Sequence, residues 1–93
     1  SIIDLSDRAK QPMTRDEISI VFNGEIYNYK ELRNILEQKG VVFNSDSDTE
    51  VILKAYMAWG IDCVNRFIGM FAFVIYDKPK NKIILCRDRA GVK

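Results

Sequence analysis

The stretch ISIVFNGEIYNYKELR, from Ile18 to Arg33, decides how this chain folds. It opens with a run rich in β-branched residues, Ile18 to Phe22, which is apolar on both faces apart from Ser19 and predicts a covered strand. The pair Asn23-Gly24 follows, and both residue types tolerate positive φ, so a sharp turn is expected there. Such a turn could aim a side-chain amide and a backbone N–H at one point, which suits an oxyanion hole. On local sequence alone, a type I′ hairpin turn is the simpler interpretation.

The composition describes one small globular domain. The 93 residues are 47% hydrophobic, and 14 basic against 13 acidic residues leave a net charge of +1. The basic residues are scattered, so nothing indicates a nucleic acid partner. No apolar run approaches the roughly 20 residues of a membrane span, so no membrane partner is expected. A cytoplasmic protein with reduced thiols fits best.

The cysteine and histidine contents restrict the possible chemistry. The two cysteines, Cys63 and Cys86, are too few for a disulfide scaffold or a structural zinc site, so no metal is expected. Nothing near either thiol indicates a lowered pKa, and both are interpreted as core packing. The chain has no histidine, which excludes Ser-His-Asp and Cys-His mechanisms. Catalysis would need another base.

Two helices are predicted from capping signals. Asn28 and Glu31 stand in capping-box spacing, which predicts a helix that begins at Asn28 and ends at Gly40. Ser47 and Glu50 repeat that spacing, so a second helix is expected to begin near Asp48. The other predicted elements are strands at Ser1–Leu5, Val41–Phe43, Gly69–Tyr76 and Lys82–Arg87, a loop at Asp7–Asp16, a helical turn at Ile61–Phe67 and a hairpin turn at Asp77–Asn81.

Strands and helices are segregated along the chain rather than alternating one by one. This order predicts an α+β fold, with two main helices packed on a mostly antiparallel sheet. The chain starts inside a strand and stops without a closing element. We therefore expect residues 1–93 to be a single partial domain, truncated at both ends.

Asp48 is a second candidate for chemistry. A carboxylate at a helix N-terminus is stabilised by free N–H groups and by the helix dipole. This capping role is sufficient to explain the residue, which would bind a ligand only if its other oxygen faced an amine. The charged run Arg87-Asp88-Arg89 is more simply explained as a solvated or ion-paired strand end.

The segment NGEIYNYKELR, from Asn23 to Arg33, closely resembles a signature of class II glutamine amidotransferases, above all the glutaminase domain of glutamine-dependent asparagine synthetases. Other pieces agree in order and spacing: SIIDL from Ser1 with QPM from Gln11, SDTEVI from Ser47, GMFAF from Gly69 and RDR from Arg87. The resemblance implies an N-terminal-nucleophile hydrolase fold, a four-layer α/β/β/α sandwich of which this chain is a part. In that family an N-terminal cysteine attacks the glutamine carboxamide, and its own α-amino group, with an unperturbed pKa near ~8, serves as base.

The resemblance also implies roles for individual residues. Asn23 matches the oxyanion-hole asparagine, Gly24 matches the partner that donates its backbone N–H, and Asp48 matches the carboxylate that holds the α-amino group of glutamine. Further residues are expected along the glutamine pocket: Ile2, Ile3 and Glu25.

The sequence departs from the family pattern in several places. The nucleophilic cysteine is absent, because Ser1 aligns inside the domain. The arginine expected to grip the α-carboxylate of glutamine would fall just before Ser1, and Ala90 stands where an aromatic is expected. The synthetase domain, which would use ATP and Mg, is missing, so this chain itself is expected to hold no cofactor. The chain alone is therefore expected to be inactive.

Three functions remain open at this stage. The resemblance favours a parent enzyme that hydrolyses L-glutamine to glutamate and ammonia for ATP-dependent asparagine synthesis from aspartate, with L-glutamine and a C-terminal synthetase domain as partners. Alternatively, the domain serves a related enzyme with another acceptor. In a third interpretation it is a non-catalytic interaction domain, where Asn23-Gly24 is a turn and Asp48 a cap. Uncovered strand edges also predict that this chain forms a homo-oligomer.

Overall fold

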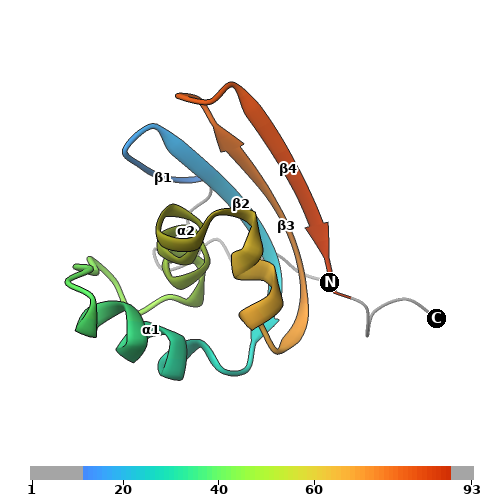
Figure 1. The fold of residues 1–93 in the computed structure, drawn as a ribbon. Coiled ribbons are helices and arrows are strands. Elements are labelled where there is room, and N and C mark those ends of the chain that lie inside the picture. Colours follow the sequence, from blue (N-terminus) through green and yellow to red (C-terminus); the bar gives the residue numbers. More distant parts are fainter. Residues whose placement is uncertain (1–11, 89–93) are drawn as a thin grey trace.

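The computed structural model describes residues 12–88, which form one sheet and a layer of helices (Figure 1). The predicted strand Ser1–Leu5 lies outside the described residues. The elements in chain order are β1 (Met13–Arg15), β2 (Ile18–Ile26), α1 (Tyr29–Gln38), α2 (Asp48–Trp59), the 3₁₀ helix η2 (Gly60–Arg66), β3 (Gly69–Asp77) and β4 (Lys82–Arg87).

The sheet is antiparallel throughout its described strands, in the order β1-β2-β3-β4. Figure 1 shows α1, α2 and η2 on the same face of this sheet. Consecutive strands are therefore neighbours in space, and the helices between β2 and β3 fold back over them. The α+β class and the two main helices predicted from the sequence are confirmed.

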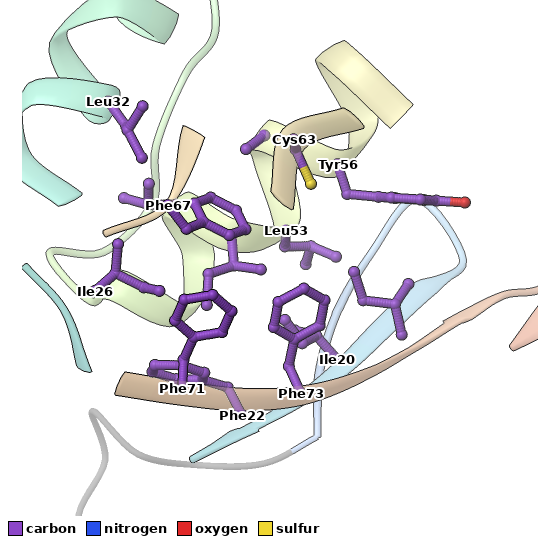
Figure 2. Close-up of a cluster of buried hydrophobic side chains, with 14 of the residues drawn as sticks. Ile20, Phe22, Ile26, Leu32, Leu53, Tyr56, Cys63, Phe67, Phe71 and Phe73 are labelled. Atoms are coloured by element: carbon purple, nitrogen blue, oxygen red, sulfur yellow. The ribbon is translucent and has the colours of Figure 1, made fainter. Parts of the chain in front are cut away.

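The core lies between the sheet and the helices. Alternate residues of β2 and β3 point toward the helices, as the two-residue period of a strand requires. Phe67 directly follows η2 and packs edge-on against Phe71 and Phe73, with ring centroids 5.8 and 6.1 Å apart. Figure 2 shows these rings gathered with Leu53 of α2 and Ile20 of β2. Burial of this apolar surface holds the helices on the sheet.

The other face of the sheet is apolar and exposed within residues 12–88. The exposed apolar side chains on it are Val21, Met70, Val74, Tyr76, Ile83 and Leu85. Val21 is 50% exposed, so in the described part of the chain β2 is covered on one face only, not on two as predicted. We refer to this surface as the open face.

The turn predicted at Asn23-Gly24 is wrong. β2 continues to Ile26, with Asn23 opposite Ala72 and Gly24 opposite Phe71. Pairing with a long β3 on one side keeps both residues within the strand, which overrides the local preference of Asn-Gly for turns, although Gly24 has a positive φ of 116°.

A hairpin turn is found earlier in the chain, at Asp16-Glu17. These residues join β1 to β2 with φ values of 52° and 67°, and positive φ at both central positions is the mark of a type I′ turn. The predicted loop Asp7–Asp16 is therefore wrong at Met13–Arg15, which form β1. The rest of that loop up to residue 11 lies outside the described residues.

The cap predicted for α1 is in place, but its side-chain bonds differ from the prediction. Asn28 precedes the helix, and its side chain makes no capping hydrogen bond. Instead, its Nδ2 donates to the carbonyl of Arg66 at 2.8 Å, and its Oδ1 accepts from the N–H of Ile68 at 3.0 Å. Asn28 thus joins the start of α1 to the segment that enters β3, a long-range role that spacing alone does not reveal.

The predicted strand Val41–Phe43 is absent, and these residues are irregular. The N–H of Val41 donates to the carbonyl of Leu36, and the N–H of Gly40 donates to that of Glu37, both at 3.0 Å. These bonds close the end of α1, with Gly40 at a φ of 98°. Val42 is 71% exposed, so the apolar run is not a core strand. The strands β3 and β4 and the η2 turn lie where predicted, within one residue, whereas β2 runs four residues further than the predicted strand Ile18 to Phe22.

Candidate functional site

Asn23 presents its side chain on the open face of the sheet. It is exposed and lies opposite Ala72 of β3, which in turn lies opposite Arg87 of β4. The small side chain of Ala72 leaves a shallow hollow of about 340 Å³ between these residues. The hollow is lined by Val21, Asn23, Ala72, Phe73, Val74, Leu85, Cys86 and Arg87. The Asn23 amide is therefore a polar group within a mostly apolar depression, held on a paired strand.

Gly24 occupies a place in β2 that other residues do not fit. Its φ is 116°, which L side chains rarely adopt. A Cβ at this position would clash with the carbonyl oxygen of Met70 and lie 2.8 Å from the Cα of Phe71. The close approach of β3 therefore demands glycine next to Asn23.

The backbone N–H of Gly24 points away from β3. Phe71, its cross-strand partner, uses its own N–H and carbonyl on the β4 side, where they bond to Oδ1 and N of Asp88 at 2.9 and 3.0 Å. Gly24 and Phe71 are thus a non-hydrogen-bonded pair of the ladder. The Gly24 N–H consequently faces the side of β2 where β1 lies, beyond Ile20, the last β2 residue that β1 pairs with.

Asp48 lies beside the end of β2. It is the first residue of α2, which is capped by Ser47 rather than by Asp48 itself. Burial has the largest effect on the Asp48 carboxyl and raises its pKa above 3.8, while hydrogen bonds from backbone N–H groups, that of Ile26 first, oppose the rise. The charge of Glu25 raises this pKa further. Asp48 is therefore brought together with the segment that carries Asn23 and Gly24, although a helix and a loop separate them in sequence.

The other residues expected along the glutamine pocket are Glu25, Ile2 and Ile3, and the structure describes the first of them. Glu25 is exposed in β2 opposite Met70, close enough to Asp48 for its charge to act there. Ile2 and Ile3 lie outside the described residues. Within residues 12–88, no group of His, Cys, Asp and Glu side chains could hold a metal ion.

Neither cysteine has the properties of a nucleophile. Burial raises the pKa of Cys63 to about 12, and it also raises the pKa of Cys86 above its usual value. Both are free thiols that pack on or within the core (Figure 2 shows Cys63). A thiol that stays protonated at neutral pH is a poor nucleophile, so the interpretation as core packing is confirmed.

Glu50 is a residue whose importance the sequence prediction missed. Its side chain is fully buried, yet it does not complete the capping box by bonding to the N–H of Ser47. Its oxygens accept from the N–H groups of Asn44 and Ser45 and from the Ser45 hydroxyl. The signal in the sequence is a carboxylate placed directly before the apolar run from Val51 to Leu53.

Comparison with known proteins identifies the family. A model described as "Glutamine amidotransferase domain" matches residues 1–93. The chain belongs to this family of domains. It is 45% identical over 109 residues to a putative glutamine-hydrolysing asparagine synthetase 2 of Methanocaldococcus jannaschii, and 48% identical over 95 residues to asparagine synthetase 2 of Bacillus subtilis. The match covers all of this chain but only 21% and 12% of those proteins.

A solved glutamine amidotransferase has the same fold. The glutamine phosphoribosylpyrophosphate amidotransferase of Bacillus subtilis superposes with a TM-score of 0.77 at 22% sequence identity, covering 97% of this chain and 22% of that one. The predicted N-terminal-nucleophile hydrolase fold is thereby confirmed. Among the helices formed by residues 12–88, none is long and apolar enough to span a membrane.

Proposed function

We propose that this amidotransferase domain binds L-glutamine and stabilises the oxyanion formed when the glutamine carboxamide is attacked. The observation that carries the proposal is the placement of the Asp48 carboxylate beside Ile26, two residues beyond the Asn23-Gly24 pair on β2. A carboxylate and two N–H donors at one end of a strand match the two ends of glutamine, which carries an ammonium group at one end and a carboxamide at the other.

The positions of these groups support the following chemistry. The Asn23 side-chain amide and the Gly24 backbone N–H donate hydrogen bonds to the developing oxyanion, and strand pairing with β3 fixes the backbone from which both donors project. The Asp48 carboxylate binds the α-amino group of the substrate by a charge-assisted hydrogen bond. The nucleophile in this proposal is an N-terminal cysteine of the full-length protein, since burial raises the pKa of both Cys63 and Cys86, which pack within and against the core.

We further propose that the ammonia released here reaches an ATP- and Mg-dependent synthetase domain, which amidates aspartate in the cytoplasm. The names of the asparagine synthetases that match this chain support this acceptor. Residues 1–93 themselves would need no cofactor and no nucleic acid. Taken alone, they would self-associate through the apolar open face, which size-exclusion chromatography with light scattering would detect.

A glutaminase assay on the full-length protein tests the central proposal. Asn23→Ala removes one oxyanion donor and is expected to lower kcat by about a hundredfold or more, with little change in KM for glutamine. Asn34→Ala, at an exposed position of α1, is the matched control and should keep full activity. An unchanged kcat in Asn23→Ala would show that Asn23 only forms part of the strand. The proposed oxyanion role of Asn23 would then be wrong, although the chain would still have the fold of the family.

A further inference from the structure

A buried carboxylate, that of Glu50, lies two residues after Asp48 in the first turn of α2. The Glu50 side chain is 0% exposed, as are its neighbours Val51 and Ile52. Removing a charged group from water is costly unless it is well paired, so a carboxylate buried here needs hydrogen-bond or ion-pair partners that compensate for its lost hydration. The proposed chemistry at Asn23, Gly24 and Asp48 does not use it.

Most of these partners lie in the loop that leads into α2. Glu50 Oε1 accepts from the N–H of Ser45 at 2.8 Å and from its hydroxyl at 2.7 Å, while Oε2 accepts from the N–H of Asn44 at 2.9 Å. Arg15 of β1 adds a cation, with Nε 3.7 Å from Oε2. An apolar residue in place of Glu50 would leave these loop donors unpaired, so the carboxylate determines where the loop can lie.

The contacts of Glu50 continue to Asp48 through two serines, Ser45 and Ser47. The Ser45 hydroxyl, held by Glu50, lies 3.1 Å from the Ser47 hydroxyl and accepts from the N–H of Ser47. The Ser47 hydroxyl in turn accepts from the N–H of Glu50 and caps α2. Asp48 follows Ser47 directly, so its backbone is fixed by a closed ring of hydrogen bonds between the helix and the loop.

We propose that Glu50 is a positioning residue for glutamine binding, because its buried carboxylate holds the Asn44–Ser47 loop and thereby sets the direction of the Asp48 carboxylate toward β2. This inference rests on the proposed role of Asp48. Glu50 touches no substrate and acts only through the loop. A binding group that is not held in place binds its ligand more weakly, so a fixed loop is functionally important.

Steady-state kinetics of glutamine hydrolysis by the full-length protein test the proposal. Glu50→Gln keeps the shape of the side chain but removes its charge and one of its two acceptor oxygens. It is expected to raise KM for glutamine on the order of tenfold, while kcat per folded enzyme changes little, since the α-amino contact is the same in the ground and transition states. A purely structural role for Glu50 would lower the folded fraction and leave KM unchanged.

Tyr56→Phe is the matched control. It removes another buried hydrogen bond of α2, from the Tyr56 hydroxyl to Asp77, at a place further along the helix from the site. It should reduce stability and leave KM for glutamine unchanged. A raised KM in this control would overturn the proposal, because general loosening of α2 would then account for the effect.

The double variant Asp48→Asn with Glu50→Gln shows whether Glu50 acts through Asp48. The KM of the double variant should equal that of Asp48→Asn alone, because the group that Glu50 positions is then missing. If the increases in KM caused by the two single substitutions multiply in the double variant, the proposal is wrong. A raised KM in Asp48→Asn with an unchanged KM in Glu50→Gln would overturn only the role of Glu50, whereas an unchanged KM in both would overturn the role of Asp48 and this inference with it.

Discussion

The Tyr56 hydroxyl donates a 2.6 Å hydrogen bond to Oδ2 of Asp77, and this bond joins α2 to the end of β3. Both residues are buried, and Oδ1 of Asp77 accepts from the N–H of Lys80 in the turn that follows. One carboxylate therefore holds a helix and a hairpin turn together.

Tyr56→Phe is expected to lower the free energy of unfolding by about 1–3 kcal/mol, because Asp77 Oδ2 would stay buried without this partner. Urea denaturation at neutral pH measures the change. Tyr76→Phe is the matched control, because the Tyr76 side chain lies on the open face and is 40% exposed. Equal effects of the two substitutions would contradict the importance of the buried bond.

Gly24→Ala is expected to cost roughly 3 kcal/mol or more, because it combines positive φ with a collision against the β3 backbone. Gly40→Ala separates the two causes. Gly40 has a φ of 98° but open space around it, so its substitution should cost about 1–2 kcal/mol from backbone strain alone. Urea denaturation of both variants compares them. A Gly24→Ala protein as stable as Gly40→Ala would show that β3 moves aside easily.

The pH dependence of kcat/KM for glutamine is expected to show the titration of Asp48. The carboxylate must be charged to bind an ammonium group, so kcat/KM falls as pH drops through the Asp48 pKa, which burial holds above 3.8. Glu25→Gln removes a negative charge that raises this pKa, so the acid limb should move to lower pH. Asp48→Asn should raise KM and abolish the limb. An acid limb that survives in Asp48→Asn would assign the titration to another group.

Stability is expected to fall at alkaline pH. The pKa values of Cys63 and Tyr56 are raised from 9.0 and 10.0 to about 12, so the folded state keeps protons that the unfolded chain releases. The stabilisation is complete below pH 9 and is lost as the pH rises from there toward 12. Urea midpoints measured across this range should decline, and Cys63→Ala should make the decline shallower. A slope unchanged by that substitution would exclude Cys63 as a cause.

Much of the fold could be predicted, because apolar runs and helix caps lie within short stretches of sequence and the packing of the whole domain does not override them. The continuous apolar run from Gly69 to Tyr76 and the Ser47 cap of α2 both have a physical basis within a few residues. The Asn23-Gly24 turn failed because pairing with β3, a long-range interaction, decides the conformation there. The type I′ turn at Asp16-Glu17 was missed because neither residue is glycine.

The candidate site was only partly predictable for the same reason. Asn23, Gly24 and Asp48 could be named from motifs, but their mutual placement depends on how α2 packs against β2. The spacing of Ser47 and Glu50 predicts a capping box. It does not reveal that the Glu50 carboxylate instead accepts hydrogen bonds from the N–H groups of Asn44 and Ser45.

The direction of the Gly24 N–H decides whether a ligand competes with strand pairing for this hydrogen-bond donor. Since this N–H faces away from β3, a ligand that accepts a hydrogen bond from it takes none from the β2–β3 ladder. Binding and release would therefore leave strand pairing intact through every cycle. The sheet can then donate this hydrogen bond to each ligand without breaking any hydrogen bond between its strands.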